Sequence, residues 1–157
     1  MSGELIRMIY ETNGYILGQT VAGLSHADSL LQPPFKANCL NWVVGHVVNN
    51  RNWILSLLGL PPVIASEKMA PYKRGAAPVQ EGAAVVQFAE LLAAYEQSQI
   101  RIMGALKEIS AETLASPTTN GRSLAHMLAF LGWHEGYHIG QTDLLRQLAG
   151  KNDQVIP

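Results

Sequence analysis

The sequence predicts an all-α protein, a four-helix bundle that forms a single domain over residues 1–157. Apolar residues recur at spacings of three and four along four long segments, which is the period of a helix with one buried face. No segment alternates apolar and polar residues over a useful length, as a half-buried strand would. Proline, glycine and asparagine residues separate the four segments and mark the expected helix ends.

The first two helices are delimited by such residues. The first is expected from about Gly3 to about His26, and it must end before the prolines that begin at Pro33, because proline cannot continue a helix. The second is expected to begin at Asn38, a good N-cap residue, and to stop at Gly59.

The third helix is expected from about Glu81, and the fourth from Ser123, another good N-cap residue, to Gly150. A long connection of about twenty residues, Leu60 to Gln80, separates the second helix from the third, whereas links in helical bundles are usually ~2–8 residues. This connection is therefore expected to cross the length of the bundle. The two helices that it joins would be parallel, which gives an up-down-down-up topology.

Composition and charge exclude several classes of function. Eleven basic and twelve acidic residues leave a formal net charge of −1, without the basic surface that nucleic-acid binding requires. The single cysteine, Cys39, excludes an intramolecular disulfide. The charged N-terminus does not resemble a signal peptide, and no apolar run reaches the ~20 residues of a membrane span. We expect a cytoplasmic protein that binds neither nucleic acid nor membrane.

A histidine pair in the fourth predicted helix carries the strongest functional signal. His134 and His138 are one helical turn apart, so both imidazoles can bind one metal ion from the same face. Gln141 belongs to the same stripe, which Leu145 and Leu148 extend as core positions. The two histidines are therefore expected to point inward.

His46 is the expected third metal ligand. It lies midway along the second predicted helix, on an inward stripe with Trp42 and either Asn49 or Asn50. A buried imidazole without a partner is costly, so this side chain either makes a core hydrogen bond or binds a metal ion. Because another helix offers two inward histidines, we predict a three-histidine site with one coordination position left open.

Other residues are candidates for the surroundings of this site. Trp42, Asn50 and Gln141 could line a substrate pocket or form hydrogen bonds around the metal. For Trp42 the alternative is an ordinary core position, and for Gln141 it is a hydrogen bond between helices. None of these side chains identifies the substrate.

Glu135 follows the first histidine of the pair and completes the H-E-x-x-H string of zinc peptidases, where the glutamate is the base. Gln141 and Leu144 occupy the downstream positions at which metzincins have glycine and histidine. No strand is predicted that could present an extended peptide substrate. A metallopeptidase is therefore kept only as an alternative, with Glu135 as a candidate catalytic base or as part of a solvent-exposed helix face.

Two segments resemble a known family. Residues 134–141, His-Glu-Gly-Tyr-His-Ile-Gly-Gln, are similar to the H-x-x-x-H-x-G-Q signature of the DinB-like (DinB/YfiT) metalloproteins. Residues 42–46, Trp-Val-Val-Gly-His, resemble that family's segment with a single histidine on the second helix. The resemblance covers nearly the whole chain, since it includes the four helices, the long second connection and the late histidine pair.

The resemblance implies a bundle that binds one divalent metal ion, often nickel or zinc, through His46, His134 and His138. It also implies a homodimer and, for some members, S-transfer or isomerisation with a low-molecular-weight thiol. A metal with an open position can activate a thiol or water, so the chemistry agrees. We expect a metal-dependent enzyme that acts on a small-molecule substrate, an S-transferase or a related hydrolase or isomerase. A non-catalytic metal-binding stress-response module is the alternative.

Overall fold

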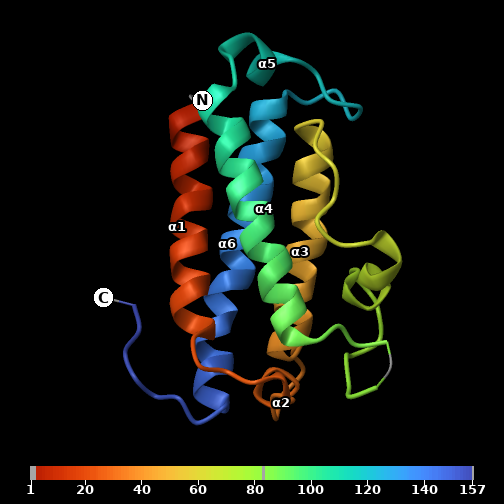
Figure 1. Ribbon diagram of the computed structural model, residues 1–157, viewed down its shortest axis with the longest axis vertical. Coiled ribbons are helices and arrows are strands. Elements are labelled where there is room, and N and C mark those ends of the chain that lie inside the picture. Colours follow the sequence, from red (N-terminus) through yellow and green to blue (C-terminus); the bar gives the residue numbers. More distant parts are fainter. Residues whose placement is uncertain (1–2, 83, 157) are drawn as a thin grey trace.

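The computed structural model describes residues 3–82 and 84–156 and confirms the all-α prediction, since no strand forms within these ranges. Four long helices form a bundle, and three short elements cap or connect them (Figure 1). The elements are α1 (Gly3–Val21), α2 (His26–Ser29), α3 (Leu40–Leu57), the 3-10 helix η1 (Ser66–Tyr72), α4 (Phe88–Glu108), α5 (Ala111–Ala115) and α6 (Leu124–Leu148).

The directions of the four long helices follow from the chain colours in Figure 1. α1 runs down the view, α3 and α4 both run up, and α6 runs down again. The long connection between α3 and α4 returns along the side of the bundle and contains η1. α1 packs against α4 and α6, and α3 packs against the same two helices. No helix of the described residues is long and apolar enough to cross a membrane.

The end of the first helix differs from the prediction. α1 ends at Val21, where Gly23 turns the chain with a positive φ of 71°. His26 does not lie at the end of α1 but begins α2, whose N-cap is Ser25. Its Nδ1 accepts a hydrogen bond from the backbone N–H of Phe88 at 3.1 Å. His26 therefore caps the start of α4, a tertiary contact that the sequence pattern did not indicate.

Two further helix starts were predicted too early. α3 has Cys39 as its N-cap instead of Asn38, and that cysteine makes no side-chain cap hydrogen bond. α4 begins at Phe88 instead of at about Glu81. By contrast, α6 begins as predicted, because the hydroxyl of Ser123 accepts a hydrogen bond from a backbone N–H of the first turn.

A layer of buried polar side chains divides the core. The apolar side chains form two clusters, and each of the four long helices contributes to both. On every long helix a buried polar residue falls between the members of the two clusters: Asn13, Arg51, Ser98 and, on α6, Glu135 followed one turn later by His138. The core of the bundle therefore has an apolar layer at each end and a polar layer between them. In the polar layer an ion pair connects α3 to α6.

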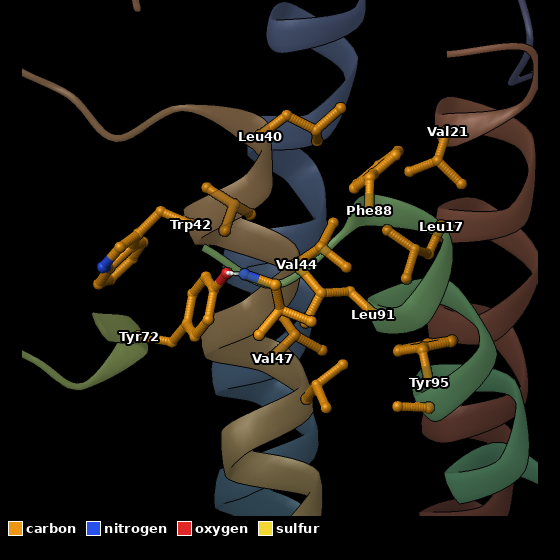
Figure 2. Packing of buried hydrophobic residues seen from close by; sticks show 14 of the residues in the cluster. Leu17, Val21, Leu40, Trp42, Val44, Val47, Tyr72, Phe88, Leu91 and Tyr95 are labelled. Carbon is orange, nitrogen blue, oxygen red and sulfur yellow. Dashed lines mark hydrogen bonds between the residues drawn. The ribbon is translucent and has the colours of Figure 1, made fainter. Parts of the chain in front are cut away.

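The 3-10 helix η1 is attached to α3 through Tyr72, which is fully buried. Its hydroxyl donates to Asn41 at 2.8 Å and accepts from the backbone N–H of Val86 at 2.9 Å. Figure 2 shows its ring against α3 beside Val44. A Cβ at Gly45 would overlap this ring, so the glycine allows the close approach.

Candidate metal centre

The structure brings the three histidines of the predicted site together between α3 and α6. Each of His46, His134 and His138 offers a ring nitrogen, and these three atoms lie within 4.8 Å of one another. The ring centroids of His138 lie 4.7 Å from His46 and 4.6 Å from His134. His46 and His138 are buried, and His134 is partly exposed. The set therefore has two inner histidines and one that faces the exterior.

Two of the rings are oriented by close hydrogen bonds at Nδ1. In His46 this atom lies 2.7 Å from the backbone carbonyl oxygen of Tyr72, which can only accept, so Nδ1 carries the proton and donates. In His138 it lies 3.0 Å from Oε1 of Gln141. Gln141 therefore orients the ring of His138, which is one of the roles that the sequence allows for this side chain. Both rings keep Nε2 for another partner.

The third ring has a longer contact. Nδ1 of His134 lies 3.5 Å from the carboxamide of Asn50, whose oxygen and nitrogen exchange places when the amide turns over. Asn50 therefore lies beside the three histidines. A protonated Nδ1 on His134 can donate to the Asn50 oxygen, which leaves Nε2 free as on the other two histidines.

The surroundings keep the three imidazoles neutral near neutral pH, the form that binds a metal ion. Burial lowers the pKa of His138 to about 4, although its hydrogen bond with Gln141 opposes part of this effect. Burial also lowers the pKa of His46, against the opposing effect of the Tyr72 carbonyl. Burial lowers the pKa of His134 as well, and the repulsion that a protonated His46 would exert adds to it.

Trp42 forms one wall of the site. Its indole stacks on the His46 ring with centroids 4.7 Å apart and an interplanar angle of 6°. It also lines a cavity of about 360 Å³ together with His138 and Gln141. The cavity places open space next to His138. Trp53, also on α3, is 45% exposed and does not line this cavity.

Glu135 is not on a solvent-exposed face, as one alternative proposed, but is only 2% exposed. Its Oε2 accepts from Nε of Arg51 at 2.8 Å, and its Oε1 accepts from Nη2 of the same guanidinium at 2.7 Å. Arg51 is itself fully buried and also donates to the hydroxyl of Tyr95 at 2.7 Å. Both carboxylate oxygens are thus engaged in an ion pair, and the geometry offers no support for Glu135 as a peptidase base.

Sequence reasoning missed Arg51 and Tyr72. Arg51 could have been found, because it falls inside the apolar stripe of α3 between Val48 and Ile54, where a charged residue requires a buried partner. Tyr72 gave no such signal, since it lies in a proline-containing connection without a periodic pattern. The carbonyl that orients His46 therefore comes from a segment that only the tertiary fold brings close.

Comparisons with known proteins agree with this architecture. A family model described as the DinB superfamily matches residues 10–142. Among solved structures, the chain is similar to a conserved protein from Enterococcus faecalis, with a TM-score of 0.71 and 17% sequence identity, over 95% of this chain and 98% of that one. At this identity the likeness shows the fold alone. No curated protein matches the sequence.

Proposed function

The chain belongs to the DinB superfamily, and from this premise we propose that it binds one divalent metal ion through His46, His134 and His138 and is a metal-dependent enzyme. The observation that carries the proposal is the convergence of three ring nitrogens within 4.8 Å. Three histidine ligands with an open position are typical of catalytic metal sites, whereas structural zinc sites are usually closed by four protein ligands.

The donor set fits the metals that the family resemblance implies. Neutral imidazole nitrogens suit zinc and nickel, whereas magnesium and calcium prefer oxygen ligands. His46 and His138 are pre-oriented by Tyr72 and Gln141, so little side-chain freedom is lost on metal binding. Nickel and zinc are therefore the metals that we propose for this site.

A metal bound here would lower the pKa of a thiol or water at its open position and make it nucleophilic near neutral pH. We propose that the nucleophile is a low-molecular-weight thiol and that the reaction is S-transfer to a small molecule, with hydrolysis or isomerisation as the related versions. The cavity beside His138 offers space for the cosubstrate. Its walls include the aromatic rings of Trp42 and Tyr137.

A non-catalytic metal-binding module is the second candidate, and one observation favours it. The acidic side chain next to the metal ligands, Glu135, has both oxygens bonded to Arg51. No carboxylate of the described residues joins the three histidines in the ligand group. A site that only stores or senses a metal would need no base.

Conjugation assays separate the two candidates. Protein purified without an affinity tag is loaded with Ni²⁺ or Zn²⁺ and incubated with glutathione, bacillithiol or mycothiol and an electrophilic acceptor. Conjugate formation that disappears in His46→Ala supports the enzyme. The matched control is His126→Ala, which removes an exposed histidine of α6 that lies outside the site. Metal binding without conjugate formation in any thiol would favour the non-catalytic module.

We also propose that the protein is cytoplasmic, since its single cysteine fits a reducing compartment, and that it forms a homodimer, as the family resemblance implies. One side of α6 carries exposed large apolar side chains at spacings of three, four and seven residues: Phe130, Trp133, Tyr137 and Leu144. Such a stripe is suited to helix packing against a second copy. Light scattering of the purified protein measures the mass, and a monomer at every concentration would contradict the proposal.

A further inference from the structure

The cavity beside His138 lies between two different parts of the chain. One wall is the irregular segment 35–38, and the other is α6 with Tyr137, His138 and Gln141. Trp42 of α3 closes the space between them. Most of the lining is apolar or aromatic, which suits a flat or aliphatic body rather than a strongly hydrated one.

The charged side chain that lines this cavity is basic. Lys36 lines it, and the described residues of the lining include no acidic side chain. The nearby Glu135 is buried and bonded to Arg51, so its charge is balanced within the bundle. A ligand that enters here meets unpaired positive charge.

A hydrogen-bond donor in the same wall lacks a partner. Nε1 of Trp42 is the one buried side-chain nitrogen or oxygen among the described residues without a hydrogen bond. Figure 2 shows the indole on the side of α3 away from α1 and α4, with this nitrogen at its outer end. Indole can only donate, and a buried donor without an acceptor costs free energy. An acceptor on a ligand would remove this cost.

We propose that this cavity binds the carboxylate group of the small-molecule substrate, with Lys36 supplying the charge and the indole N–H of Trp42 donating a hydrogen bond. The inference deepens the proposed function, because the same substrate would present its reacting atom to the metal position at His138. The irregular segment 35–38 contributes Lys36 to the wall of this cavity.

The experiment titrates phenylacetate into the metal-loaded protein and follows the indole ¹H–¹⁵N signals by NMR. The chain has three tryptophans, so Trp42→Phe assigns the signal of interest. Phenylacetamide is the matched neutral probe, with the same ring and one oxygen replaced by an amide nitrogen. We expect phenylacetate to shift the Trp42 signal and to bind at least roughly tenfold more tightly than phenylacetamide, because a charged acceptor forms the stronger hydrogen bond.

Lys36→Met tests the source of the charge. We expect phenylacetate to bind roughly three- to fivefold more weakly to this variant, because the lysine is exposed and its ion pair is partly screened. Lys107→Met, at the far end of α4, is the matched control and should bind as the wild type does. Equal affinity for the two probes, a shift confined to the other tryptophans, or equal binding to both lysine variants would overturn the inference.

Repeating the titration after metal removal separates this inference from the proposed function. Selective binding to the metal-free protein that still depends on Lys36 supports the carboxylate site even if the chain takes up no metal. Binding that requires the metal and is equally tight in Lys36→Met would mean that the carboxylate coordinates the ion. That result would overturn the inference and leave the metal proposal intact. Measured metal content of the same sample identifies which of the two proposals has failed.

Discussion

Arg51 on α3 donates two hydrogen bonds to the carboxylate of Glu135 on α6, from Nε at 2.8 Å and from Nη2 at 2.7 Å. The pair lies in the polar layer between the two apolar clusters and joins the two helices that carry the histidines. Burial alone would lower the pKa of Arg51, but the charge of Glu135 raises it above its usual value. We infer that the pair fixes how α3 and α6 lie against each other at the three histidines.

Removing the charge of only one partner of this ion pair is expected to be strongly destabilising. Glu135→Gln keeps the shape but leaves the Arg51 charge buried and unpaired, at a cost of about 3–5 kcal/mol in the free energy of unfolding. Replacing both residues, as in Arg51→Met with Glu135→Leu, should recover most of that loss. Urea unfolding of both variants and the wild type measures these differences.

The exposed pair of Arg7 and Glu11, 3.9 Å apart on α1, provides the control. Glu11→Gln should change the free energy of unfolding by less than about 1 kcal/mol, because exposed pairs contribute little. If Glu135→Gln lost no more than Glu11→Gln, the buried pair would not hold the helices together.

Gly45→Ala is expected to damage both stability and the metal site. The added methyl group would overlap the ring of Tyr72, whose carbonyl orients His46. Overpacking of this kind costs about 1–3 kcal/mol. The control is Gly104→Ala in α4, where an added Cβ meets nothing within 4 Å and helix propensity favours alanine by about 1 kcal/mol. Thermal unfolding and metal titration should separate the two variants, and equal behaviour would contradict the role of Tyr72.

Gln141→Leu is expected to weaken metal binding without unfolding the protein. The substitution removes the acceptor 3.0 Å from Nδ1 of His138, and such orienting partners are worth about 10–100-fold in metal affinity. Competition with a chromophoric chelator measures the affinity. Gln147→Leu removes an exposed amide from the same helix and should leave the affinity unchanged. An unchanged affinity in Gln141→Leu would mean that the ring needs no such support.

Acid is expected to weaken the contact between the C-terminal segment and α6. Hydrogen bonds from Arg146 lower the pKa of Asp153 below its usual 3.8. Because the folded value lies below the unfolded one, the stabilisation is present above pH 3.8 and is lost as the pH falls through the folded value. Asp153→Asn should therefore be less stable than the wild type at pH 6, and the difference should vanish in stronger acid. A difference that persists unchanged at low pH would contradict this linkage.

The periodic part of the fold was predictable. Four amphipathic segments and the absence of alternation led to an all-α bundle, and Ser123 marked the start of α6 correctly. The errors lie where tertiary contacts decide local structure. α4 begins at Phe88, whose N–H is bonded by His26 across 62 residues of sequence, and no local pattern contains that contact.

The candidate site divides in the same way. The spacing of His134 and His138 predicted one shared face, and an inward stripe on α3 predicted His46, because helical geometry alone fixes both. Their supporting groups depend on tertiary packing. Arg51 and Glu135 are separated by 84 residues in the sequence, so no local pattern pairs them. The alternative that placed Glu135 on a solvent-exposed helix face was wrong for this reason.

X-ray absorption spectroscopy of protein loaded with Ni²⁺ or Zn²⁺ and free of any affinity tag tests the central claim most directly. The proposed site predicts one metal ion per chain with three imidazole nitrogens, at about 2.0–2.1 Å for zinc, and one fewer imidazole in His138→Ala. A spectrum with only oxygen scatterers around the metal, or one that His138→Ala leaves unchanged, would contradict the three-histidine centre.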